Sequence, residues 1–178
     1  MTTEQYVNDA LRTESLSPEV QARFEDLNMI NRLHSSLMIS IRVSQEMDTV
    51  KKMLFYGKNY RQTNAKTDAK SIQDCLTEKN IRLLHSAIGL FTEAGELLQA
   101  LSDHFFDGLE LDSVNISEEL GDCFWYLAIG SDALKTGFPA IMEQNIEKLR
   151  ARYPEKFDSQ KAINRDLAAE RSILEGEK

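Results

Sequence analysis

The 178-residue sequence contains few of the residues that interrupt helices or staple small domains: three prolines, eight glycines and two cysteines. Proline and glycine both destabilise a helix interior, so their scarcity leaves room for long helices. Cys75 and Cys123 show no CxxC spacing and have no cysteine or histidine partner nearby in the sequence. This excludes a zinc-binding pattern and indicates reduced, structural thiols of the kind found in cytosolic proteins.

Positive net charge and long apolar runs are also missing. The net charge is −8, whereas a dedicated nucleic-acid binder needs a basic surface to displace counterions. No segment reaches the roughly 20 apolar residues that span a bilayer, and the polar N-terminal stretch MTTEQYVNDALRTES lacks the apolar core of a signal peptide. We therefore expect a cytoplasmic protein that binds neither nucleic acid nor membrane.

Strand signals are absent as well, whereas apolar residues recur with the 3.6-residue period of helices. We predict an all-α fold, a four- to five-helix bundle that residues 1–178 build as a single domain with its core at about 19–153. The predicted helices cover about 6–12, 19–55, 71–106 with a break near 79–80, 115–136, 139–153, and a tail helix at about 160–175. Asn115 and Glu118 resemble a capping box, and Pro139 stands where a first helical turn tolerates proline.

The sequence carries one weak internal repeat, at an offset of 51 residues. The aligned identities are Leu33–Ser35 with Leu84–Ser86, Phe55 with Phe106 and Gly57 with Gly108. Two amphipathic helices can agree by chance to this extent. The alternative is an old helix duplication in which only the second copy carries acids, because the first copy has Arg42 and Gln45 at the positions of the acids.

Two pairs of acidic residues stand next to apolar runs of the predicted helices. Glu93 and Glu96 lie within HSAIGLFTEAGELLQAL, and Glu119 and Asp122 lie within SEELGDCFWYLA. Residues three apart are neighbours on one helix face, so antiparallel packing of the two helices would bring four carboxylates together. Like charges about 4 Å apart repel by roughly 4 kcal/mol at an effective dielectric near 20, and protonation or a bound cation must relieve this repulsion.

Ligation by carboxylate oxygens alone suits Mg²⁺ or Mn²⁺, which we predict as the cofactor. A di-iron centre in a helical bundle requires Glu-x-x-His motifs, and none precedes His34, His85 or His104. The alternative interpretation places the acids on a solvated helix edge, paired with lysines. The repetition of the i, i+3 acid pair beside a second apolar run favours the metal site.

A third segment, NIEKLRARYP, offers groups that bind phosphate. Asn145, Lys148 and Arg152 follow the spacing of one helix face, and ammonium and guanidinium groups both bind phosphate oxygens. The alternative is an ordinary amphipathic helix whose basic residues suit the negative end of the helix dipole. Trp125 is interpreted first as a core residue and second as a base-stacking residue, and His85 as a core histidine.

These motifs together resemble the all-α nucleoside triphosphate pyrophosphohydrolases of the MazG-like superfamily, in particular its short, phage-type branch. The family signature is EExxE, a gap, and then ExxD. Here it reads Thr92-Glu93-x-x-Glu96 and Glu119-x-x-Asp122, so Thr92 replaces the leading glutamate. The resemblance covers about residues 82–171. A basic FYGK-like segment that follows the first acid pair in the family reads FDGLELD here, whereas FYGK occurs earlier and ends at Lys58.

The resemblance implies metal-dependent hydrolysis of a (deoxy)nucleoside triphosphate at the α–β bond, giving the monophosphate and pyrophosphate. The implied catalytic and metal-binding residues are Glu93, Glu96, Glu119 and Asp122. The implied substrate-binding residues are Asn145, Lys148 and Arg152, with Trp125 and Lys58 as further candidates.

The same resemblance favours dGTP or GTP as the substrate, with dUTP or dCTP as the second expectation. A catalytically silent helical module that binds nucleotide or only oligomerises is the alternative from a different class of protein. The resemblance also implies that a homodimer or homotetramer completes the bundle, in the cytoplasm, or in the host cytoplasm if the protein is phage-encoded.

Overall fold

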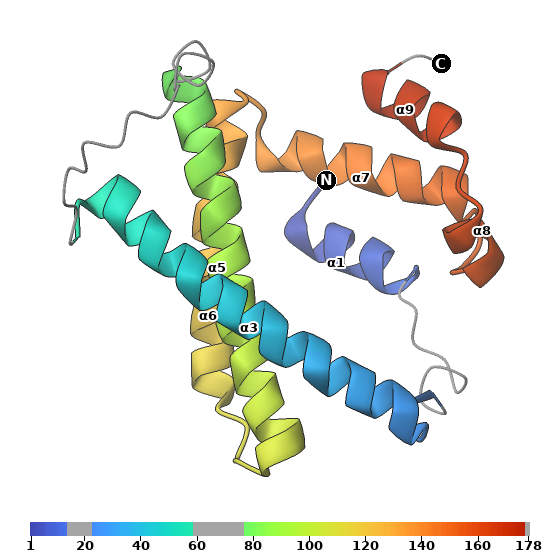
Figure 1. The fold of residues 1–178 in the computed structure, drawn as a ribbon. Helices are drawn as coiled ribbons and strands as arrows, with labels where there is room; N and C mark the ends of the chain where they lie inside the picture. Colours follow the sequence, from blue (N-terminus) through green and yellow to red (C-terminus); the bar gives the residue numbers. More distant parts are fainter. Residues whose placement is uncertain (14–22, 59–76, 177–178) are drawn as a thin grey trace. The chain divides into compact units, whose positions relative to one another are not determined.

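The computed structural model describes residues 1–13, 23–58 and 77–176, and every regular element in these ranges is an α-helix. The predicted all-α fold is therefore confirmed. The helices are α1 (Thr3–Leu11), α3 (Leu27–Tyr56), α5 (Glu78–Asp107), α6 (Ser113–Ala133), α7 (Phe138–Arg152), α8 (Ser159–Ile163) and α9 (Leu167–Glu175) (Figure 1). None of the described helices combines the length and the apolar character that a membrane-crossing helix requires.

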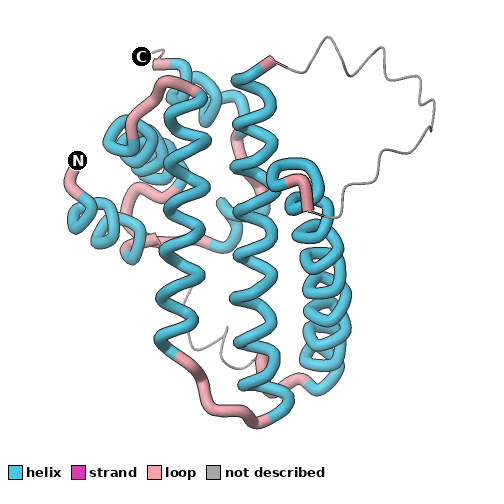
Figure 2. Tube along the Cα trace, turned by 90° about the vertical axis from the view of Figure 1, so that its left-hand side faces the viewer, coloured by secondary structure: helices cyan, strands magenta, loops and turns pink. Residues whose placement is uncertain are grey.

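Helices α3, α5 and α6 form one compact unit, Asp26–Lys135, which we call the three-helix unit. Helix α5 contacts both α3 and α6. Figure 1 shows α3 crossing α5, and Figure 2 shows α5 and α6 side by side, joined by a short loop at one end so that they run antiparallel. This packing brings the two acid-bearing segments of the sequence onto neighbouring helices.

Capping residues set the starts of these helices and correct three predicted boundaries. Helix α3 begins at Leu27 and not near residue 19, because Asp26 is extended and its carboxylate accepts hydrogen bonds from two following N–H groups. Helix α5 begins at Glu78 behind the cap Thr77 and is continuous through 79–80. Helix α6 begins at Ser113, capped by Asp112 instead of the predicted Asn115. Residues 14–22 and 59–76, which include Cys75, part of two predicted helices and the polar linker, lie outside the described residues.

Contacts between α3 and α5 occur in pairs that the 51-residue offset relates: when two residues touch, their counterparts in the opposite helices touch as well. Both helices have 30 residues and end at glycines of positive φ, Gly57 at 67° and Gly108 at 70°, a conformation that favours glycine. The ring stack of His34 on Phe106 (centroids 4.3 Å apart) corresponds to the stack of His85 on Phe55 (4.1 Å).

The buried residues of the two helices obey the same relation. All three buried residues of α3, which are Ile41, Ser44 and Lys51, have buried counterparts in α5, which are Thr92, Gly95 and Ser102. Ser44 packs directly on Gly95, its own counterpart. An interface in which residue i contacts j and j contacts i has local twofold symmetry. The geometry therefore supports the helix-duplication hypothesis over a chance agreement.

The other compact unit comprises Met1–Glu25 and Thr136–Lys178, and we call it the terminal unit. Pro139 lies in the first turn of α7, and Tyr153 caps its end, as predicted. Helix α1 contacts α7 through the Arg150–Asp9 ion pair (2.7 Å) and the hydrogen bond from Tyr6 to Asn145 (3.3 Å). The single tail helix predicted at about 160–175 is in fact two helices, α8 and α9, because the chain leaves the helical conformation at Asn164 and Asp166 caps a new helix, which packs on α7.

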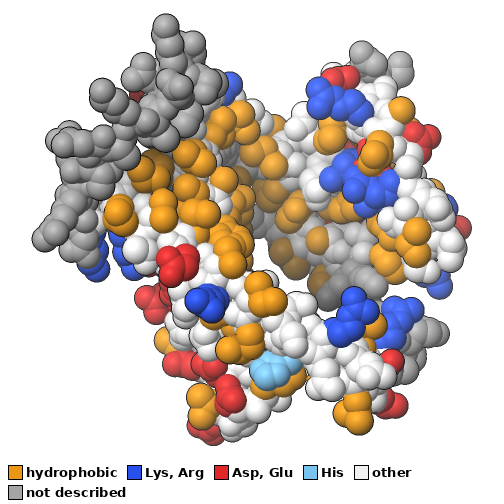
Figure 3. All heavy atoms as spheres, viewed as in Figure 1, with side chains coloured by type: hydrophobic (Ala, Val, Ile, Leu, Met, Phe, Trp, Pro, Cys, Tyr) orange, Lys and Arg blue, Asp and Glu red, His pale blue; other side chains and the backbone are white. Residues whose placement is uncertain are grey.

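Helix α3 exposes several large hydrophobic side chains, among them Met38, Ile39, Val43, Val50 and Leu54. On the face drawn in Figure 3, hydrophobic side chains gather over α3 and the adjoining part of α5. Apolar surface of this kind suits a contact with another chain. Completion of the bundle by a homodimer or homotetramer remains a prediction.

Candidate functional site

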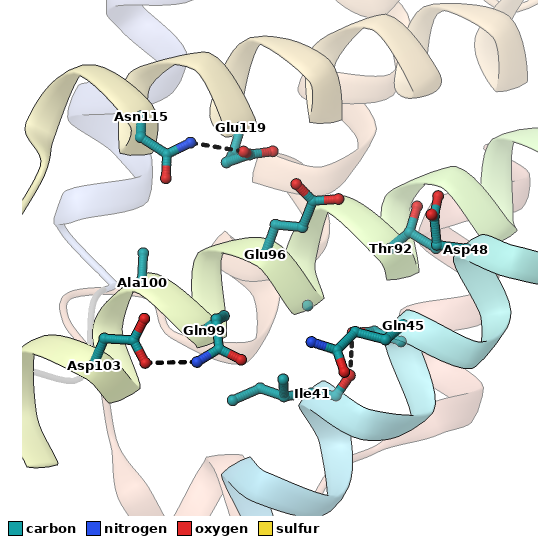
Figure 4. A pocket seen from close by; sticks show the side chains of 12 residues that line it. Ile41, Gln45, Asp48, Thr92, Glu96, Gln99, Ala100, Asp103, Asn115 and Glu119 are labelled. Carbon is teal, nitrogen blue, oxygen red and sulfur yellow. Dashed lines mark hydrogen bonds between the residues drawn. The ribbon is translucent and has the colours of Figure 1, made fainter. Parts of the chain in front are cut away.

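Three of the four predicted acids come together between α5 and α6. Glu93 and Glu96 from α5 and Glu119 from α6 each offer one oxygen, and these oxygens all lie within 4.8 Å of one another. Glu93 and Glu119 are buried, and Glu96 is exposed. Figure 4 shows the side chains of Glu96 and Glu119 pointing toward each other from the two helices. We call these three residues the acid cluster.

The electrostatics of the acid cluster follow from this crowding. Burial raises the pKa of Glu96, and the negative charges of Glu93 and Asp48 raise it further. Burial also raises the pKa of Glu119 against the opposing hydrogen bond from Asn115, whose amide donates over 2.8 Å, and neighbouring acids add to the rise. The protein therefore holds these carboxylates where a cation would stabilise their charged forms.

Asp122 lies one turn after Glu119 on α6 and is exposed. Its charge contributes to the raised pKa of Glu119. Among the described residues, the group that offers oxygens at short mutual distances contains Glu93, Glu96 and Glu119, without Asp122. The predicted role of Asp122 as a metal ligand therefore remains a prediction.

Lys51 of α3, a residue that no sequence motif indicated, also reaches the acid cluster. Its side chain is 4% exposed. The Nζ atom lies 2.7 Å from Thr92 Oγ1, 3.0 Å from Glu93 Oε1 and 3.2 Å from Asp48 Oδ1. Burial alone would lower the pKa of Lys51, but its contacts with Tyr126, Glu93 and Asp48 raise the pKa above the ordinary value of a lysine, so the ammonium stays charged.

Thr92, which replaces the leading glutamate of the family signature, has a defined place in this arrangement. It is 1% exposed, and its hydroxyl accepts a hydrogen bond from Lys51. The hydroxyl proton is free to be donated to Gly89 O (2.9 Å) or to Glu93 Oε1 (3.1 Å). Thr92 thus supplies an acceptor to the lysine without adding a negative charge.

A cavity of about 410 Å³ opens beside the acid cluster. Its walls come from α3, α5 and α6, and its lining residues are Ile41, Ser44, Gln45, Asp48, Thr92, Gly95, Glu96, Gln99, Ala100, Asp103, Asn115 and Glu119 (Figure 4). Gln99 donates a hydrogen bond to Asp103 over 2.6 Å inside it. The volume lies within the range of small-molecule sites.

Two further predicted residues belong to the three-helix unit. Trp125 is 53% exposed on α6, so its interpretation as a core residue is wrong, and its ring makes T-shaped contacts with His85 and Tyr126. Lys58 follows the end of α3 and lines a smaller hollow of about 180 Å³ together with Asp48. His85 itself is half-buried and stacks on Phe55, as expected for a core histidine, but among the described residues its buried Nε2 atom has no hydrogen-bond partner.

The three residues predicted to bind phosphate lie on α7 in the terminal unit. Asn145 accepts the hydrogen bond from Tyr6. Arg152 donates two hydrogen bonds to the carboxylate of Glu170, over 2.7 and 2.6 Å. Lys148 is half-buried on the same helix.

The donor set of the acid cluster fits a divalent cation. Carboxylate oxygens are the hard ligands that Mg²⁺ and Mn²⁺ prefer, and the oxygens of Glu93, Glu96 and Glu119 already converge. Burial first and neighbouring negative charges second raise the pKa values of Glu96 and Glu119, and a bound cation would favour the charged forms against both effects.

Comparison with known proteins gives one match. The MazG nucleotide pyrophosphohydrolase domain matches residues 84–157, a range that includes the acid cluster and α7. Neither the curated proteins nor the solved structures contain a match. This match supports a MazG-like nucleotide pyrophosphohydrolase domain over residues 84–157, in agreement with the all-α fold and the signature residues at 93, 96, 119 and 122.

Proposed function

We propose that the protein hydrolyses a (deoxy)nucleoside triphosphate between the α- and β-phosphates, releasing the monophosphate and pyrophosphate. The acid cluster carries this proposal, because its three acids each offer one oxygen within 4.8 Å of the others. Two of these acids, Glu96 and Glu119, line a cavity whose volume is in the range of small-molecule sites. The MazG domain match supports nucleotide pyrophosphohydrolase activity in general.

In this proposal Glu93, Glu96 and Glu119 hold Mg²⁺ or Mn²⁺, with Asp122 as an additional ligand. The bound ion would supply Lewis-acid chemistry, which neutralises phosphate charge and activates water. The oxygen of a water molecule forms the new bond to the α-phosphorus while the bond to the bridging oxygen of the β-phosphate breaks. A carboxylate of the cluster accepts the proton of that water, and a raised glutamate pKa suits this task.

Asn145, Lys148 and Arg152 are the proposed phosphate and sugar contacts. Lysine offers a point charge and arginine a planar pair of donors. Glu170 holds the Arg152 guanidinium through Nε and Nη2 in the terminal unit, so a phosphate would be bound by the remaining N–H donors of Arg152. Trp125 and Lys58 are proposed as secondary contacts to the base and the phosphates.

A guanine nucleotide is the proposed preferred substrate. Asp103 lines the cavity, and a carboxylate is an acceptor that suits the N–H groups on the guanine edge. A pyrimidine nucleotide such as dUTP or dCTP is the alternative. The protein would act in the cytoplasm as a homodimer or homotetramer.

The test is a panel of all deoxynucleoside and ribonucleoside triphosphates, each incubated with Mg²⁺ or Mn²⁺ while pyrophosphate is measured. We expect release of pyrophosphate, fastest with dGTP or GTP. Glu119→Gln should lower the rate by about 100-fold or more and leave the helical circular dichroism unchanged. Glu118→Gln removes an exposed carboxylate one position away on the same helix and serves as the matched control.

Failure of every nucleotide in the panel would refute the enzyme proposal. Metal-dependent nucleotide binding by calorimetry, without turnover, would then favour the catalytically silent module.

A further inference from the structure

Lys51 is a buried positive charge that the proposed chemistry leaves without a role. It belongs to α3, and its ammonium is enclosed by oxygens of Thr92, Glu93 and Asp48 at distances from 2.7 to 3.2 Å. A lysine is almost never fully buried unless it is paired. Since removing an ammonium from water is costly, the surrounding oxygens must compensate for its burial.

The local twofold relation between α3 and α5 gives each residue of one helix a counterpart in the other, and the counterpart of this lysine is not a lysine. The counterpart of Lys51 is Ser102, and the counterpart of Thr92 is Ile41, both of them buried. On the other side, the positions equivalent to Lys51 and Thr92 are therefore Ser102 and Ile41, and neither residue carries a charge. The buried ammonium occurs on the side that carries the acids, which links the lysine to the acid cluster and not to helix packing in general.

The charges around Lys51 indicate what it does there. Glu93 offers one oxygen to the cluster and accepts a hydrogen bond from Lys51 over 3.0 Å. Thr92 stands where the family signature has a glutamate, so this cluster has one acid fewer and one buried ammonium close by. Both features reduce the negative charge that a divalent ion has to neutralise.

We propose that Lys51 is the resident cation of the acid cluster, a positioning residue that holds Glu93 and limits the cluster to a single, moderately bound divalent ion. The inference rests on the proposed function only in that the cluster binds a divalent ion. Because two positive charges near one carboxylate repel each other, the ammonium weakens the binding of the ion in the absence of nucleotide.

The experiment titrates Mn²⁺ into the full-length chain without nucleotide and follows free Mn²⁺ by electron paramagnetic resonance. The wild-type protein should bind one ion per chain. Lys51→Gln, which keeps a hydrogen-bond donor and removes the charge, should bind Mn²⁺ about tenfold more tightly or accept a second ion. Lys52→Gln is the matched control, because Lys52 pairs with Asp48 on the same helix but its side chain is 42% exposed; its affinity should change much less.

A folded Lys51→Gln protein that binds Mn²⁺ no more tightly than wild type would overturn the proposal. So would two or more tightly bound ions per wild-type chain, a result that needs no variant to fold. The proposed hydrolysis is measured separately by pyrophosphate release. If nucleotide is hydrolysed but Lys51→Gln does not change Mn²⁺ binding as predicted, only the role of Lys51 is refuted. If Mn²⁺ binding changes as predicted but no nucleotide is hydrolysed, only the proposed hydrolysis is refuted.

Discussion

Gly95→Ala tests the close crossing of α3 and α5 on which the site depends. A Cβ atom at residue 95 would lie 1.9 Å from Ser44 Oγ and 2.2 Å from Ser44 Cβ. The hydroxyl can rotate away, but the Cβ atom is fixed to the backbone of α3. The substitution therefore has to push the two helices apart.

The expected cost combines two opposing effects. Overpacking by a methyl group costs about 1–3 kcal/mol, and contact with a Cβ atom that cannot rotate places this site at the upper end. Replacing glycine by alanine inside a helix returns up to about 1 kcal/mol. We expect a net destabilisation of about 2 kcal/mol, which corresponds to a melting temperature lower by about 4–8 °C for a chain of this size.

The assay is urea and thermal unfolding followed by circular dichroism, with Ser44→Gly as the compensating substitution. In the double variant Ser44→Gly with Gly95→Ala, the nearest remaining atom of residue 44 is its Cα at 3.7 Å, an ordinary contact. The double variant should recover to within about 1 kcal/mol of wild type, which gives a coupling energy of about 2 kcal/mol in the double-mutant cycle. A Gly95→Ala protein as stable as wild type, or a double variant no better than the single one, would refute the reasoning.

Binding of Mg²⁺ or Mn²⁺ should weaken as the pH falls, because the raised pKa values of Glu96 and Glu119 let protons compete with the ion at a higher pH than an ordinary glutamate allows. A carboxyl group with a raised native pKa favours the fold when protonated, so the metal-free protein loses this contribution as the pH rises through that pKa. The increase in melting temperature caused by the ion should therefore grow between about pH 5 and pH 7.5; an increase independent of pH would contradict this. Glu170→Gln should lower the hydrogen-exchange protection of α9, since Arg152 and Arg165 both donate to Glu170 and lower its pKa to about 2. That stabilisation is present above the ordinary pKa of about 4.5 and is lost as the pH falls toward 2, so identical acid unfolding curves for variant and wild type would count against it.

The sequence predicted those features that depend on local spacing. The i, i+3 pattern placed Glu93 and Glu96 on one helix face, and antiparallel packing brought them to Glu119 as expected. The sequence also predicted the start of α7 at Pro139 and its end before Pro154. These features follow from the helical period and from proline chemistry, which act within a few residues.

The missed features depend on contacts between distant segments or on competition between caps. Asp112, and not Asn115, caps α6, and the side chain of Asn115 donates a hydrogen bond to Glu119 instead. Nothing in the local sequence distinguishes Lys51 from an exposed lysine of an amphipathic helix, and its burial results from the packing of α3 against α5. The only signal in the sequence was the 51-residue offset, which placed α3 in register with the acid-bearing helix.

The reciprocal contacts of α3 and α5 also bear on how the site can evolve and assemble. Between two identical chains, each residue beside the axis is repeated on the other side, so every substitution changes two places at once. Two helices of a single chain are free of this constraint, and here one side carries Lys51 and Thr92 while the other carries Ser102 and Ile41. The tether also turns a bimolecular association into an intramolecular one. The pairing of Lys51 with Glu93 should therefore persist at dilutions where separate chains would dissociate.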